Sequence, residues 1–220
     1  MGNNFKSAFR DRHLAEEALR QSAISFGLHC ARRQRHFLLP FILLLLVNCA
    51  APIKQFFPDT YYPEDHIYEN KPLRFVLKFD GNWELITDPN ELSRSAKKTV
   101  INWAKAGIEL LFIGSTVEGL HTTRGMVEHL NMPPREFAER VQSNSKSSVT
   151  NDKGLTEMVM GRNSMIKWIY DKDGFRYAEF FFTIDTYDIR IAFCSRPADF
   201  ERFLPIYESI MSTLQVTGGM

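Results

Sequence analysis

An apolar run near the N-terminus, residues 37–47, limits what the segments on either side of it can be. It begins at Phe37, contains Pro40, and follows three arginines within residues 32–35. A helix that spans a membrane needs about 20 apolar residues, and proline weakens the interior of a helix. A basic stretch followed by roughly 7–15 apolar residues is the arrangement of a secretory signal. The run therefore predicts export of the chain that follows it.

The residues that end this run, Leu46-Val47-Asn48-Cys49, resemble the lipobox of bacterial lipoproteins. The resemblance implies that the signal peptide is removed and that Cys49 receives diacylglycerol and an N-acyl chain such as palmitate. Several acyl chains hold a soluble domain durably on a membrane. Asn48 departs from the usual Gly, Ala or Ser, and Ala50, in place of Asp, favours the outer membrane in a host that has one. The alternative is an uncut membrane anchor in which Cys49 is incidental.

Three segments are predicted: an N-terminal extension and signal segment (1–48), a lipidated cysteine with a tether (49–72), and a folded domain (73–217). The first 30 residues are long for the basic part of a signal. Either residues 5–22 form an amphipathic helix or translation starts further along the chain, which we favour. The tether is expected because residues 51–72 hold four prolines and no regular pattern.

Charge and cysteine content exclude several classes of partner. The chain has 27 basic and 26 acidic residues, and removing residues 1–48 leaves 20 and 23, a net charge of −3. Nucleic-acid binding needs concentrated positive charge, so no nucleic-acid partner is predicted. The three cysteines, Cys30, Cys49 and Cys194, form no Cys-x-x-Cys pair for zinc or redox chemistry.

Residue patterns after position 73 predict an α+β domain in which an antiparallel sheet is flanked by helices, an α/β/α sandwich. Short connections that contain turn residues predict that the last four strands form an antiparallel meander. Pro205 lies inside the apolar stripe of the last helix and predicts a kink or break there. Strands are expected at 74–79, 83–87, 108–116, 123–131, 155–161, 164–171, 175–184 and 187–195, and helices at 91–106, 134–145 and from 197 onward.

Two stretches resemble the PsbP-like (also DcrB-like) α/β/α sandwich. They are LRFVLKFDGNWEL, which begins at Leu73, and RYAEFFFTIDTYDIRIAFCSRPADFERFLPIYESIMSTLQV, which ends at Val216. The shared features are a strand leading to a Gly-x-Trp turn, and a closing strand, turn, strand and helix. The resemblance implies secreted or membrane-associated accessory and binding proteins, mostly without known catalysis. It brings no catalytic residue, metal ligand or cofactor to this chain.

An aromatic cluster in the last third of the chain is the candidate binding feature. If the sheet face were partly uncovered, Trp168, Tyr170, Tyr177 and Phe181 would form an interaction surface. The alternative, which we favour, is a sheet covered on both faces, where such residues are core. His66, His121 and His129 lack the spacing of a metal site and are expected at the surface or at strand ends.

Two functions remain from the sequence, and neither is catalytic. The first is a lipid-anchored, extracytoplasmic accessory protein that binds another protein of the bacterial cell envelope. The second is a lipoprotein that binds a small apolar ligand or lipid in an aromatic and methionine-lined pocket. The methionines that suggest it are Met126, Met132, Met158, Met160 and Met165. A deep apolar cavity would favour the second function and a filled core the first.

Overall fold

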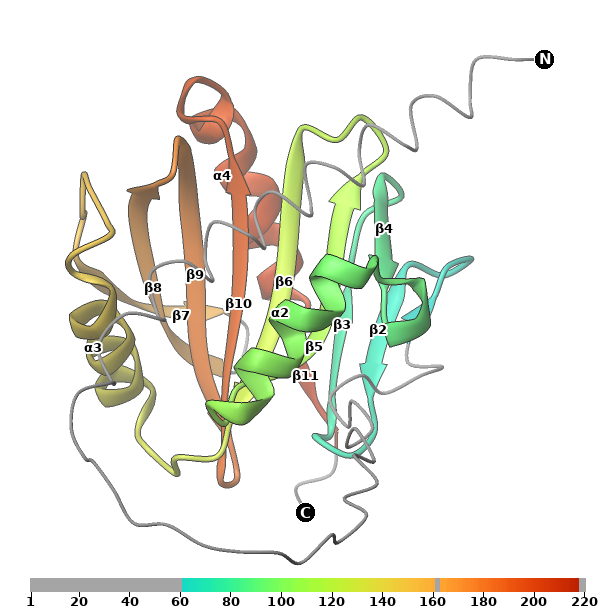
Figure 1. Ribbon diagram of the computed structural model, residues 1–220, viewed down its shortest axis with the longest axis horizontal. Coiled ribbons are helices and arrows are strands. Elements are labelled where there is room, and N and C mark those ends of the chain that lie inside the picture. The colour runs from blue at the N-terminus through green and yellow to red at the C-terminus, as the bar shows by residue number, and fades with distance from the viewer. Residues whose placement is uncertain (1–60, 161–162, 218–220) are drawn as a thin grey trace, which may run out of the picture.

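The computed structural model describes residues 61–160 and 163–217 as two antiparallel sheets with three α-helices (Figure 1). The smaller sheet has the order β1-β2-β3-β11 and the larger sheet the order β4-β5-β6-β10-β9-β8-β7. The predicted α+β class is confirmed. The smaller sheet comprises β1 (Tyr61–Tyr62), β2 (Ile67–Asn70), β3 (Phe75–Lys78) and β11 (Gln215–Val216). The larger sheet comprises β4 (Trp83–Ile86), β5 (Glu109–Thr116), β6 (His121–Glu128), β7 (Leu155–Met160), β8 (Asn163–Lys172), β9 (Phe175–Ile184) and β10 (Tyr187–Ser195).

The helices begin where the sequence supplies a start signal. A short 3-10 helix, η1 (Pro89–Glu91), follows Asp88, whose side chain accepts from the Asn90 N–H. Ser93 then accepts from the Ala96 N–H and starts α2 (Arg94–Lys105). The helices α3 (Pro134–Ser145) and α4 (Pro197–Ser212) both open with proline, which suits the first helical position.

Alternation of side chains assigns the two faces of the larger sheet. Met126, Arg190 and Phe181 are cross-strand partners on β6, β10 and β9, so they point to one face. Met126 packs with the residues of α2, and Phe181 packs with those of α3, so both helices cover this face. Phe180 and Phe182 point the other way, into the main core with α4 and the smaller sheet.

The predicted tether is wrong in its second half, because residues 61–72 belong to the folded domain. Strand β2 pairs with β3 along its whole length, and the Tyr68 side chain is fully buried against Phe112. The strands here are two and four residues long, and Pro63 stands between them. In strands this short, the alternation of apolar and polar residues is too brief to predict a strand from the sequence.

Of the kink or break predicted at Pro205, the break does not occur, since α4 continues through this residue. Proline removes only the backbone bond to the carbonyl four residues earlier, that of Glu201. Both Pro205 and Glu201 are exposed, so water can hydrate that carbonyl. In the described residues no helix is long and apolar enough to cross a membrane.

Candidate functional site

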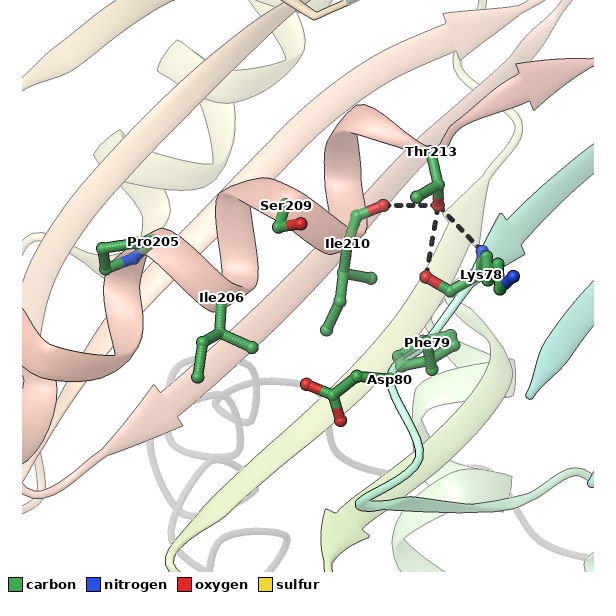
Figure 2. Close-up of a pocket in the computed structure, with 8 residues that line it drawn as sticks. All are labelled: Lys78, Phe79, Asp80, Pro205, Ile206, Ser209, Ile210 and Thr213. Carbon is green, nitrogen blue, oxygen red and sulfur yellow. Dashed lines mark hydrogen bonds between the residues drawn. The ribbon is translucent and has the colours of Figure 1, made fainter.

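A groove of about 410 Å³ lies between the end of β3 and the second half of α4 (Figure 2). Its volume falls within the range of small-ligand pockets. Two segments more than a hundred residues apart in the chain form its walls. The lining residues are Lys78, Phe79 and Asp80 on one side, and Pro205, Ile206, Ser209, Ile210 and Thr213 on the other.

Thr213 fastens the end of α4 to β3 and closes one end of the groove. Its hydroxyl accepts a hydrogen bond from the Lys78 N–H at 2.8 Å. The same hydroxyl lies 3.2 Å from the Lys78 carbonyl and 2.7 Å from the Ile210 carbonyl, either of which can take its single proton. Backbone and side chain therefore hold the two walls in one relative position (Figure 2).

The groove has an apolar floor and one carboxylate directed into it. Phe79 and Ile210 are buried, and Ile206 is half-buried. The Asp80 carboxylate points toward Ile206 and Ile210 (Figure 2), and its Oδ1 accepts from the Asn82 N–H at 3.1 Å. Such a site can bind an apolar chain. Its lining contains neither histidine nor cysteine.

Behind the groove, a buried aromatic cluster holds α4 on the sheet. Tyr207 stacks on Phe193 with ring centroids 4.9 Å apart, and Trp83 meets the edge of Phe193. The Tyr207 hydroxyl lies 3.2 Å from His121 Nδ1. Burial lowers the pKa of His121, against the carboxylates of Glu118, Asp80 and Asp199, and burial raises the pKa of Tyr207.

The histidines occupy different environments. His129 is exposed and lies 3.7 Å from a Glu109 carboxylate oxygen. His121 is the first residue of β6, one of the two positions expected for it, but it is buried rather than at the surface. It is buried because α4 crosses this end of the sheet and places Phe203 against the imidazole ring. Within residues 61–160 and 163–217, no group of three or more His, Cys, Asp or Glu could hold a metal ion.

The predicted aromatic interaction surface is wrong, because all four of its residues are buried. Trp168 and Phe181 are fully buried, and Tyr170 and Tyr177 are each 4% exposed. They form a core with α3, in which Phe137 meets Phe181 edge to face. The favoured alternative, a sheet covered on both faces, is the arrangement that the structure has. The predicted lipidation site, Cys49, lies outside the described residues.

The groove was not predicted, and neither was the composition of its lining. The groove is not the methionine-lined pocket predicted from the sequence, since none of its eight lining residues is methionine. Met160 and Met165 instead fill the main core. Lys78, Asp80 and Thr213 carry no motif, and only the packing of α4 against β3 brings them together. No signal in the sequence could have found them.

Comparisons with known proteins give only distant structural likenesses. No family model matches the chain, and no curated protein matches it. Among solved structures, the cyanobacterial PsbP of Synechocystis is 8% identical with a TM-score of 0.48, over 68% of this chain and 91% of that chain. LpqN of Mycobacterium tuberculosis, described as involved in cell envelope biogenesis, is 10% identical with a TM-score of 0.45. The match covers 66% of this chain and 83% of LpqN. A protein of Bacteroides thetaiotaomicron is 11% identical with a TM-score of 0.40, and the match covers 70% of this chain and 48% of that chain. A PsbP is thus among the similar structures, and these likenesses carry nothing about function.

Proposed function

We propose that the chain is a lipid-anchored, extracytoplasmic accessory protein of the bacterial cell envelope that acts by binding rather than by catalysis. The observation that carries the proposal is the order of segments: arginines, a short apolar run, Cys49, and then a folded domain. Lipidation of Cys49 would anchor the domain, and Ala50 favours the outer membrane in a host that has one. The partner is then another protein of the envelope.

The number of residues between Cys49 and Tyr61, the first described residue, limits how far the domain can lie from its anchor. Residues 50–60 separate Cys49 from β1, about half the tether expected from the sequence. A fully extended chain spans at most about 3.3–3.6 Å per residue, so these residues reach about 40 Å at most. The domain would therefore act close to the membrane surface, where its partner is expected.

The filled core favours a binding surface over an internal ligand chamber. Phe112, Phe180, Phe193 and Phe200 are all fully buried in one core with Tyr207. Aromatic side chains packed in this way fill the interior between the larger sheet and α4. Partner binding is expected on the outside of the domain.

Lipidation is tested by intact mass. Protein extracted from membranes of the native host should have the mass of residues 49–220 plus a diacylglycerol group and an acyl chain. A Cys49→Ser variant should lack the acyl mass and leave the membrane fraction. A Cys30→Ser variant is the matched control and should have the same mass as the wild type. An uncut, unmodified chain in all three samples would contradict the proposal and indicate a retained anchor.

A second candidate function, binding of a small apolar ligand, is favoured by the volume of the groove. N-phenyl-1-naphthylamine, a neutral dye that fluoresces in apolar sites, is a suitable probe. We expect Ile206→Asp to weaken dye binding at least tenfold, because it places a second carboxylate on the apolar floor. Val159→Asp is the matched control, since Val159 is 75% exposed on β7, away from the groove. Equal dye affinity in the two variants would rule out the groove as the apolar site.

A further inference from the structure

A strip of charged side chains crosses the larger sheet between α2 and α3. We call it the charged strip, and it consists of Arg124 and Glu128 on β6, Glu179 on β9 and Arg190 on β10. Figure 1 shows β9 and β10 running between the two helices. The centre of a seven-stranded sheet is normally apolar on both faces when helices cover it. Charges at this position need a reason beyond packing.

Three of the four residues surround one small side chain. Arg124 and Glu179 are the two cross-strand neighbours of Ala192 on β10, one on each side. Arg190 stands two residues from Ala192 on the same strand and points to the same face. Because the methyl group of Ala192 is short, the longer side chains around it extend over it. The arrangement places two arginines and a glutamate on one face of the sheet around the middle of β10.

The ion pairs within the charged strip are loose. Arg190 lies 3.6 Å from a carboxylate oxygen of Glu128 and 3.6 Å from Glu179 Oε1. Both distances exceed the 2.7–3.2 Å of a hydrogen bond. Glu179 Oε2 does accept a hydrogen bond, from the Tyr170 hydroxyl at 3.1 Å. The Arg124 guanidinium lies over the Tyr177 ring, 5.6 Å from its centroid.

Three buried polar atoms of the strip have no hydrogen-bond partner among the described residues. They are the Nε atoms of Arg124 and Arg190 and the Oε1 atom of Glu179. Glu179 is only 1% exposed. A buried polar atom without a partner destabilises the folded state, and folded proteins contain few such atoms. Two unused N–H donors on the same face of the sheet favour a bound acceptor.

The two arginines of the strip also act on titratable groups beside them. Lys172, at the end of β8, has its pKa lowered by burial and next by the charge of Arg124. Burial raises the pKa of Glu128, against the attraction of Arg190. The charge of Arg190 thus acts on Glu128, and the charges of Arg124 and Arg190 act on Lys172. A planar guanidinium group recognises carboxylate and phosphate oxygens through paired N–H donors.

We propose that the charged strip binds an anionic group, a carboxylate or a phosphate, through Arg124 and Arg190. Glu179 sets the positions of both guanidinium groups, and its Oε1 receives a hydroxyl or water hydrogen of the bound molecule. The anion comes either from a free small molecule or from the headgroup of an anionic lipid. This site is separate from the groove and goes beyond the proposed function, since it does not depend on lipidation of Cys49.

The test is titration calorimetry on the purified full-length protein in a neutral detergent, at constant ionic strength. The probes are inorganic phosphate, citrate and dihexanoylphosphatidylglycerol, with dihexanoylphosphatidylcholine as the zwitterionic control. We expect saturable binding of at least one anionic probe and none of the control. Binding of phosphate or citrate would identify a free anion as the ligand. Binding of dihexanoylphosphatidylglycerol alone would identify the headgroup of an anionic lipid.

Variants assign the binding to the strip. Arg124→Gln should raise the Kd of the bound probe at least tenfold. Arg135→Gln, which alters an exposed arginine on α3 with ion pairs to Glu139 and Glu157, should leave it unchanged. Should Arg124→Gln fail to fold by circular dichroism, Arg124→Lys keeps the charge without the paired donors and should weaken binding several-fold. No saturable binding of any anionic probe, or wild-type affinity in both Arg124 variants, would overturn the proposal.

Discussion

Replacing Tyr207 by alanine lowers the free energy of unfolding by about 3–5 kcal/mol, as large-to-small changes of buried aromatic residues do. Tyr207 is fully buried on α4, stacked on Phe193 and edge-on to Trp83 and Phe200. The change leaves a cavity under the helix and removes the hydroxyl that meets His121. Chemical denaturation of the folded protein, followed by tryptophan fluorescence, measures the effect.

Two further variants separate packing from hydrogen bonding. Tyr207→Phe keeps the ring and should cost only about 1–3 kcal/mol, the penalty for leaving His121 Nδ1 buried without its partner. Tyr62→Ala changes an exposed tyrosine on β1 and should stay within about 0.5 kcal/mol. A loss below about 1 kcal/mol for Tyr207→Ala would mean that α4 does not pack on β10 as described.

The anchoring of α4 matters for the groove because this helix provides one of its walls. Ile206 and Ile210 flank Tyr207 along α4, so they reach the groove only while Tyr207 holds the helix on the sheet. Dye binding to the groove should therefore weaken in Tyr207→Ala even under conditions where the protein remains folded. Core packing and the candidate ligand site are in this way one structural unit.

Much of the fold follows from local sequence patterns, because period-two alternation and helical stripes report burial directly. The helix at residues 134–145 begins and ends as predicted, and the strands at 175–184 and 187–195 do so as well. Each is long, strongly apolar on one side and bounded by turn residues. The segment at 61–72 failed because its strands are too short to show a period, and its burial depends on β3 and Phe112.

Neither the groove nor the charged strip could be predicted from the sequence, and the physical reason is the same for both. The groove joins residues 78–80 to residues 205–213, and the charged strip joins β6 to β9 and β10, so both exist only after distant strands and helices pack. Within their own strands, Arg124 and Glu179 read as polar positions of an alternating pattern. Cross-strand register decides that they share a face on either side of Ala192. The aromatic residues that did stand out belong to the core, since a covered sheet needs them there.

Stability should fall as pH drops below about 6.5, and His121 should be the main cause between pH 7.5 and 5.5. Burial lowers the pKa of His121 in the folded protein, and Arg202 lowers it further, although Glu118, Asp80 and Asp199 oppose the shift. The unfolded chain then takes up a proton at about pH 6.5 that the folded protein still excludes. Stability is therefore complete above that pH and declines below it, by up to about 1.4 kcal/mol per pH unit.

The measurement is the free energy of unfolding by urea at several pH values across this window, in the wild type and in two glutamine variants. His121→Gln should remove most of the decline, whatever its effect at pH 7.5, because no imidazole remains to be protonated at this position. The stability of His129→Gln should decline with falling pH as that of the wild type does, since the His129 side chain is exposed in the folded protein. Equal slopes in the wild type and in His121→Gln would show that another group controls the response. A decline confined to the proteins that retain His121 would place the proton uptake at the contact between β6 and α4, where unfolding must expose this ring before it can be charged.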